Sequence, residues 1–169
     1  TRRSSDLMTN LAWNVERVLP SAIADLHKLV SIPSISSMPE HDADVAACAE
    51  VVSELFRDLG ASEVKLLDGV GKPAVWANFP GPEGSPTVLL YAHYDVQPTG
   101  DADAWTSPAF EPTERDGRLY ARGSADDKGG VALHVAALRV FDGKPPVGVK
   151  VFIEGEEEIG SPTMPTLLD

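Results

Sequence analysis

Three segments rich in acidic side chains could do chemistry in this sequence. They read His-Tyr-Asp at residues 93–95, Asp-Asp at residues 126–127 and Glu-Glu-Glu at residues 156–158. Each follows an apolar stretch that predicts a buried strand or a short extended segment. Because ligands bind at the carboxyl ends of the strands in α/β sheets, we expect the three segments to meet there. Carboxylates gathered in this way repel one another unless a cation is bound, so the pattern predicts a metal site.

The first segment offers a metal ligand and a group that supports it. His93 and Asp95 are two residues apart, so their side chains point to the same side of an extended backbone. His93 can bind a metal while Asp95 accepts the other ring N–H, which selects the tautomer and strengthens the ligand. The alternative is a loop histidine paired with a neighbouring carboxylate, and His-x-Asp taken alone favours that ordinary interpretation.

The second segment places Asp126 at the predicted start of a helix whose first turns contain Gly129 and Gly130. A helix N-terminus stabilises a carboxylate, and the glycines allow close approach of the backbone. Asp126 is therefore a candidate metal ligand, with an N-terminal helix cap as the alternative.

The third segment contains two adjacent glutamates, Glu157 and Glu158, whose side chains diverge. One can coordinate a metal while the other reaches a bound water as general base. A solvated acidic turn is the alternative, but the preceding residues 149–153 read as an interior strand. Since the available ligands are imidazole and carboxylate with no thiolate nearby, the set suits Zn²⁺, Mn²⁺ or Co²⁺.

Hydrophobic periodicity predicts the elements that must position these side chains. Helices are expected at residues 6–19, 21–30, 41–59 and 127–141, and from Ser161 and Pro162 onward. Strands are expected at residues 63–67, 74–79, 87–92, 110–115, 118–121 and 147–153. Pro20 should separate the first two helices, and the continuously apolar run at 87–92 should be covered on both faces. The order predicts an α/β domain with a mostly parallel or mixed central sheet and helices on both faces.

The bulk composition limits the classes of protein. With 43% apolar and 24% charged residues, the 169 residues suit one globular domain. No apolar run reaches the roughly 20 residues that cross a bilayer, so we expect no membrane span. The basic start is not followed by an apolar segment with a cleavage site, so we expect no secretory signal. A net charge of -12 argues against a nucleic-acid partner. The single cysteine, Cys48, is expected to be a buried core residue. Because one cysteine cannot form an internal disulfide, we expect a protein of the reducing cytoplasm.

The same residues resemble the M20 metallopeptidases, and within them the carnosinase-like dipeptidases. The matching stretches keep the order and approximate spacing of the family's motifs, at residues 91–98, 105–110, 119–129 and 154–161. The resemblance implies a zinc-exopeptidase-like catalytic domain with two divalent ions. Zinc is the first choice for these ions, and manganese or cobalt are the alternatives.

The resemblance also implies a role for each candidate residue. His93 binds the first metal, Asp126 bridges both metals and Glu158 binds the second. Glu157 acts as general base on a water between the metals, and Asp95 supports His93. The peptide bond that follows Asp126 is implied to be cis.

The sequence departs from the family beyond the paired glutamates. The family supplies a further aspartate ligand a few dozen residues later, a histidine ligand near its C-terminus, and a smaller lid or dimerisation domain between them. Asp169 is too close to Glu158 to be that aspartate. Residues 1–169 are therefore expected to be the N-terminal portion of an incomplete catalytic domain, which binds metal weakly and hydrolyses nothing alone. The full-length protein is expected to form a homodimer through the absent domain.

Three functions are compatible with these residues. The first is hydrolysis of the peptide bond in dipeptides or short peptides, and the second is deacylation of N-acyl amino acids by the same site. The third is a non-catalytic binding or scaffold protein that retains the fold. An intact Glu157 beside His93 and Glu158 favours an enzyme, and the motifs at 91–98 and 154–161 favour a dipeptidase.

Overall fold

The computed structural model describes residues 4–68 and 71–168. Asp169 and the basic start at residues 1–3 lie outside these ranges. The helices are α1 (Ser4–Val30), α2 (Asp42–Asp58), α3 (Lys128–Val140) and α4 (Met164–Leu168), with 3-10 turns η1 (Pro39–His41), η2 (Ala102–Ala104) and η3 (Glu157–Ile159). The strands are β1 (Glu63–Leu67), β2 (Ala74–Phe79), β3 (Thr87–His93), β4 (Thr113–Arg115), β5 (Arg118–Tyr120) and β6 (Gly148–Glu154). None of the described helices is long and apolar enough to pass through a bilayer.

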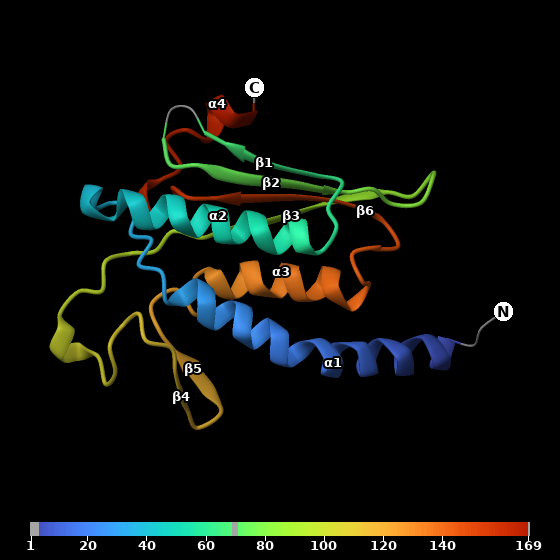
Figure 1. Cartoon of the computed structure of the whole chain (residues 1–169), viewed down its shortest axis with the longest axis horizontal. Helices are drawn as coiled ribbons and strands as arrows, with labels where there is room; N and C mark the ends of the chain where they lie inside the picture. The colour runs from blue at the N-terminus through green and yellow to red at the C-terminus, as the bar shows by residue number, and fades with distance from the viewer. Residues whose placement is uncertain (1–3, 69–70, 169) are drawn as a thin grey trace.

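The central sheet has four strands in the order β1-β2-β6-β3 (Figure 1). β3 runs parallel to β6, whereas β2 pairs in the antiparallel direction with both β1 and β6. The predicted α/β fold with a mixed sheet is confirmed. The parallel pair brings the carboxyl ends of β3 and β6 to the same edge, where His93 lies opposite Glu154.

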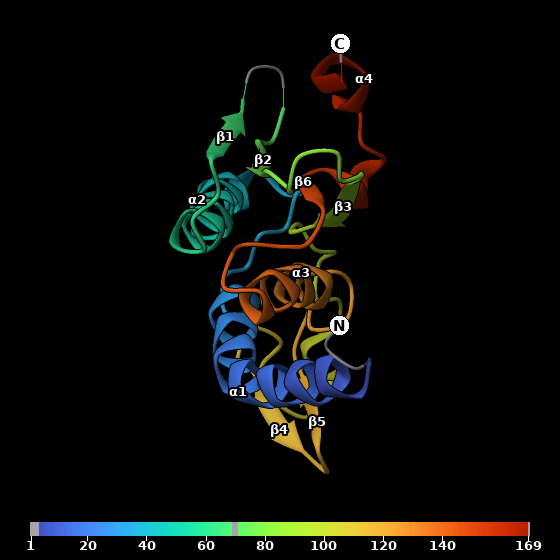
Figure 2. The same cartoon turned by 90° about the vertical axis from the view of Figure 1, so that its right-hand side faces the viewer.

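The three long helices lie on one side of this sheet (Figure 2). α2 packs on β1 and β2, α3 packs on β3, and α1 packs on α3. Because side chains alternate along a strand, Val75 and Ala77 of β2 and Val149 and Val151 of β6 share one core with α2 and α3. These three helices therefore share one side of the sheet in the described part of the chain, whereas the short helix α4 lies toward the other side (Figure 1).

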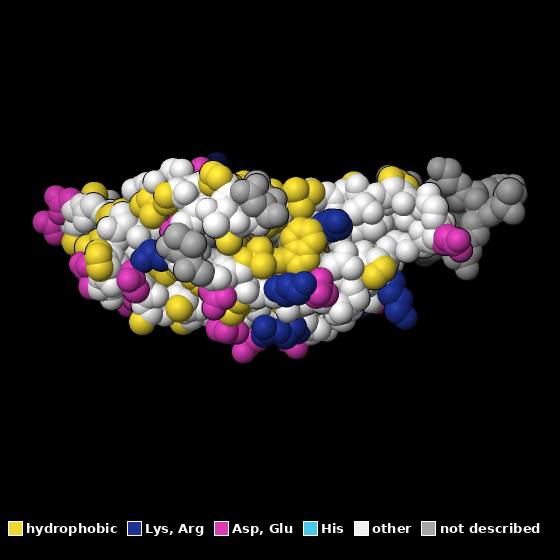
Figure 3. Space-filling view, turned by 90° about the horizontal axis from the view of Figure 1, so that it is seen from above, with side chains coloured by type: hydrophobic (Ala, Val, Ile, Leu, Met, Phe, Trp, Pro, Cys, Tyr) yellow, Lys and Arg dark blue, Asp and Glu magenta, His cyan; other side chains and the backbone are white. Residues whose placement is uncertain are grey.

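β3 forms an edge of the described sheet and is largely open to solvent. Leu89 is 62% exposed and Tyr91 is 47% exposed. The prediction of a strand covered on both faces is therefore wrong for the described residues, because an apolar run does not reveal which strand lies at the edge. Figure 3 views the molecule from the side away from α1 and α3, and hydrophobic side chains gather near the middle of that surface beside lysine or arginine.

Helix α1 is continuous where two helices were predicted. It runs through Pro20, which lacks the N–H that would donate to the carbonyl one turn earlier. Figure 1 shows α1 changing direction about half-way along, as expected when such a bond is missing. Bonds to the end of α3 hold both halves: Asn14 Nδ2 donates to the Val140 carbonyl at 3.2 Å, and Arg139 pairs with Asp25 at 2.7 Å. These bonds support the helix on both sides of the bend.

Several local signals act as the sequence predicts. Gly60 follows α2 with a φ of 82°, the left-handed conformation of a helix C-terminal cap. Asp116 and Gly117, with φ of 51° and 73°, form the predicted tight turn between β4 and β5. Cys48 is buried on α2. The last helix differs, because Ser161 has a φ of 50° and α4 begins only at Met164.

Candidate metal centre

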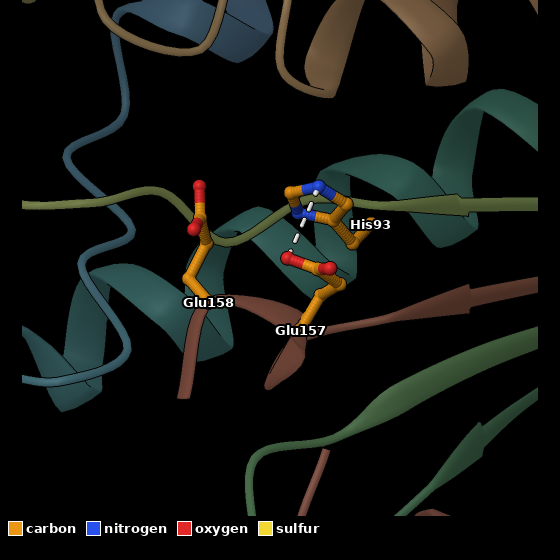
Figure 4. A group of neighbouring side chains, drawn as sticks. All are labelled: His93, Glu157 and Glu158. Atoms are coloured by element: carbon orange, nitrogen blue, oxygen red, sulfur yellow. Dashed lines mark ion pairs between the residues drawn. The ribbon is translucent and has the colours of Figure 1, made fainter. Parts of the chain in front are cut away.

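The candidate site lies at the carboxyl ends of the parallel strands β3 and β6. His93 is the last residue of β3, and the chain after β6 turns through η3, which carries Glu157 and Glu158. Figure 4 shows both glutamate side chains extending from this turn toward the end of β3, with Glu157 next to the imidazole ring. Asp126 reaches the same ring from the segment before α3. The structure therefore gathers these four side chains from three separate segments.

The distances between the candidate ligand atoms suit a bound cation. His93 Nε2 lies 3.1 Å from Asp126 Oδ1 and 3.7 Å from Glu157 Oε2. One ligand atom from each of His93, Glu157 and Glu158 lies within 4.8 Å of the others. Two donors that bind one tetrahedral Zn²⁺ at 2.0–2.2 Å are about 3.4 Å apart, close to the 3.1 Å between His93 Nε2 and Asp126 Oδ1. Nitrogen and carboxylate oxygen are also donors that zinc and manganese accept.

Asp95 connects the histidine to the glutamates. Its carboxylate is fully buried, with Oδ1 3.3 Å from His93 Nδ1, and the same ring nitrogen is hydrogen-bonded to the Asp95 backbone carbonyl at 3.1 Å. The second ring nitrogen, Nε2, therefore faces Asp126. The backbone N–H groups of Glu157 and Glu158 donate to Oδ1 and Oδ2 of the same carboxylate, at 3.2 and 3.1 Å. Asp95 thus lies where the sequence predicted a partner for His93. Its bonds to the backbone of η3 were not predicted, because they join residues 62 and 63 positions apart.

The protonation of His93 follows from these neighbours. Burial by itself lowers the pKa of His93, but the hydrogen bond and charge of Asp95, followed by Asp126 and Glu157, outweigh it and raise the pKa to about 9. The metal-free imidazole is therefore protonated near neutral pH. A cation that binds Nε2 must displace this proton.

The two aspartates before α3 have different surroundings. The side chain of Asp126 is 79% exposed and faces His93. Asp127 Oδ1 instead accepts the N–H of Gly130 at 3.2 Å, so Asp127 caps α3. The cap that was the alternative for Asp126 is therefore made by its neighbour. The peptide bond between the two aspartates is cis.

The family comparison agrees with this arrangement. A family model described as peptidase family M20/M25/M40 matches residues 89–169, a stretch that includes all five predicted site residues. Over this stretch the chain is similar to the M20 peptidases. The motif at residues 91–98 leads from β3 into the site, and the motif at 154–161 contains η3.

Three relatives show how far the similarity extends. A cysteinylglycine-S-conjugate dipeptidase of Corynebacterium striatum is 40% identical over 161 residues, which cover 89% of this chain and 33% of that protein. A succinyl-diaminopimelate desuccinylase of Delftia acidovorans is 34% identical over 138 residues, which cover 78% of this chain and 34% of that protein. The crystal structure of human carnosine dipeptidase 1 matches with a TM-score of 0.85 at 28% identity, covering 96% of this chain and 37% of that one. The chain spans about a third of the length of the curated relatives it matches.

Two further polar residues shape η3, the turn that carries the glutamates. Gln97 Nε2 donates to Glu158 Oε2 at 2.9 Å and to the Glu158 carbonyl at 3.0 Å. Glu156 is buried away from the site, where it accepts the backbone N–H of Lys72 at 2.8 Å and bonds to the hydroxyl of Thr163. The run of three glutamates therefore divides into one structural residue and two that face the site. Gln97 lies inside a recognised motif, whereas nothing in the sequence separates Glu156 from its neighbours.

A hollow of about 570 Å³ lies apart from these residues. It is formed by the loop between β3 and β4, and none of the five predicted site residues lines it. Its walls include Thr99, Trp105, Pro108 and Phe110. The side chains of Asp126 and Glu157 are 79% and 44% exposed, so the candidate metal centre is an open surface.

Proposed function

We propose that residues 1–169 form the N-terminal portion of the catalytic domain of a metal-dependent peptidase that hydrolyses dipeptides or short peptides. The observation that carries this proposal is the grouping of His93, Glu157 and Glu158 at the end of β3 and β6, with one ligand atom of each within 4.8 Å of the others and with Asp126 Oδ1 3.1 Å from His93 Nε2. Two of the three relatives are dipeptidases, which supports a peptide substrate. The proposal also includes a homodimer of the full-length protein, formed through a domain outside this chain.

Each residue has a distinct role in this proposal. His93 and Glu158 would each hold one divalent ion, and Asp126 would be a ligand of both. When bound, the ions, with zinc preferred over manganese or cobalt, would supply positive charge that polarises the scissile carbonyl and favours ionisation of water. Glu157 takes the proton of the attacking water and delivers it to the leaving amine. Asp95 keeps the Nε2 atom of His93 directed at the site.

The ligand set within this chain is incomplete under the proposal. Each ion lacks a protein ligand that a longer chain would supply, which agrees with the coverage of about a third of the relatives. We therefore expect residues 1–169 alone to bind Zn²⁺ or Mn²⁺ weakly and to hydrolyse no peptide. Tight binding of two ions in isothermal titration of this chain would contradict that expectation.

A deacylase is the second candidate function. The similarity to a succinyl-diaminopimelate desuccinylase favours it, because the same site would then act on the amide of an N-acyl amino acid. Assays of the full-length protein on dipeptides and on N-acetyl or N-succinyl amino acids separate the two functions by their kcat/KM.

The decisive variant of the full-length protein is Glu157→Gln. A glutamine cannot accept the proton, so turnover should fall by about 10²- to 10⁴-fold, while the metal content measured by mass spectrometry should stay near that of the wild type. Glu83→Gln, at an exposed position between β2 and β3, is the matched control and should keep full turnover. Unchanged turnover in Glu157→Gln would remove Glu157 as the base, and a wild type that hydrolyses neither class of substrate would favour a binding protein.

A further inference from the structure

The loop between α1 and η1 lies against the segment that follows β3. Ile35 and Val96 form a parallel bridge, and the N–H of Val96 donates to the Ser34 carbonyl at 3.0 Å. The hydroxyl of Ser34 donates to the carbonyl of Tyr94 at 2.7 Å. The loop therefore runs alongside residues 94–96 and is hydrogen-bonded to them.

Ser36 of this loop is directed at the buried carboxylate that organises the site. Its hydroxyl donates to Asp95 Oδ2 at 2.6 Å, the short distance typical of an O–H donor on an ionised carboxylate. Ser36 is 4% exposed and Asp95 is 0% exposed, so water does not readily replace this hydroxyl. The same Oδ2 atom also accepts the N–H of Glu158.

Lys128 fixes the loop from the other side. It is fully buried in the first turn of α3, and its Nζ donates to the Leu29 carbonyl at 2.9 Å and to the Ile32 carbonyl at 2.6 Å. A buried ammonium group is costly unless it is hydrogen-bonded, and the carbonyls of Leu29 in the last turn of α1 and of Ile32 just after it are its partners. Lys128 follows Asp126 by two residues, so one turn anchors both the loop and a candidate metal ligand.

We infer that Ser36 is a positioning residue of the metal centre, acting through Asp95. With the Ser36 hydroxyl in place, Asp95 keeps one oxygen toward His93 Nδ1 and both oxygens on the N–H groups that set the direction of Glu157 and Glu158. Without it, the buried carboxylate loses a short hydroxyl bond while the N–H groups of η3 still hold it, so its orientation toward the histidine is less firmly set. The inference rests on the proposed function for the role of the site, but its test measures metal binding directly.

The test compares two buried serines of the same loop in the full-length protein. Ser36→Ala should weaken binding of Mn²⁺ by about 10- to 100-fold in isothermal titration, the usual effect of removing a residue that orients a metal ligand. It should also change the visible absorption spectrum of the Co²⁺-loaded protein, because the geometry of the histidine and carboxylate ligands changes. Ser34→Ala is the matched control, since its hydroxyl donates to a backbone carbonyl. It should leave the Mn²⁺ affinity within about twofold, even where it lowers the melting temperature.

Two results would overturn the inference. The first is a Ser36→Ala variant with the Mn²⁺ affinity and the Co²⁺ spectrum of the wild type. The second is an equal loss of Mn²⁺ affinity in Ser34→Ala, which would mean that the affinity depends on packing of the whole loop. If Ser36→Ala does not fold, Ser36→Cys replaces it, because the thiol has a similar volume and is a weaker donor. It should also weaken Mn²⁺ binding, and wild-type affinity in this variant would overturn the inference. A wild type that binds Mn²⁺ but hydrolyses neither dipeptides nor N-acyl amino acids would end the proposed function and leave the result for Ser36 intact.

Discussion

The two ends of β3 lie in different surroundings although its residues from Val88 to Ala92 are all apolar or aromatic. At the start of the strand, Val88 is 42% exposed and Leu89 is 62% exposed. At its end, Ala92 is fully buried and His93 is 5% exposed. The buried end is surrounded by residues 34–36 and by η3, whereas the open end lies at the edge of the sheet.

This difference shows that neighbours from distant parts of the chain decide the role of each part of a strand. The apolar composition only ensures that the strand can be buried. The polar bonds to Asp95, from the loop after α1 and from η3, make one end rigid and chemically defined. If the comparison is right, substitutions at the two ends should differ greatly in effect.

The largest effect is expected for Asp95→Ala in this chain. It removes a buried charge and leaves the Ser36 hydroxyl and the N–H groups of η3 without an acceptor, which should lower the free energy of unfolding by about 3–5 kcal/mol. Urea unfolding followed by circular dichroism measures this change. Asp58→Ala, at the exposed end of α2, is the control and should change it by less than about 0.5 kcal/mol. A similar small effect for Asp95→Ala would show that the buried end of β3 is not held by polar bonds.

An intermediate effect is expected from pH in the absence of metal. The folded pKa of His93, about 9, lies above the usual value near 6.5 in an unfolded chain. The resulting stabilisation is fully present below about pH 6.5 and is lost as the pH rises through about 9. Unfolding measured from pH 6 to 10 in EDTA should therefore show stability falling over this window. His93→Gln should lack this part of the fall, and an unchanged profile in that variant would assign the titration to another group.

The smallest effect is expected at the open end of β3. Leu89→Ala should change the free energy of unfolding by no more than about 0.5 kcal/mol, because the side chain is 62% exposed. Val151→Ala, on the neighbouring strand and fully buried, serves as the comparison and should lower stability by about 2 kcal/mol or more. A loss at Leu89 as large as that at Val151 would mean that the open face is covered in solution.

The local elements were largely predictable from the sequence. The bounds of β1 and β2 agree with the prediction, and those of α2 and α3 differ by one residue at each end. Hydrophobic periodicity and turn residues such as Gly60 and Gly117 are local properties, so they can be interpreted one segment at a time. The continuity of α1 through Pro20 could not be predicted in this way, because it depends on bonds to α3.

The candidate site was predictable to the extent that it depends on strand ends. His93, Asp126, Glu157 and Glu158 lie together because β3 and β6 are parallel neighbours, and their roles stay predictions. The residues that hold them were missed for a physical reason: Ser36 is 59 residues from Asp95, and Lys72 is 84 residues from Glu156. Such pairs leave no periodic pattern in the sequence. A position at the edge of the sheet is equally a property of the assembled strands.

The parallel register of β3 and β6 also limits how this domain can diverge. His93 lies opposite Glu154, three residues before the first glutamate of the site. Because the direction of side chains reverses at every residue of a strand, an insertion or deletion of a single residue in β6 would turn its core residues outward or move η3 away from the histidine. Substitutions on the open face are tolerated far more easily. Among descendants of this sequence, the lengths of these two strands should therefore vary less than the residues on their exposed side.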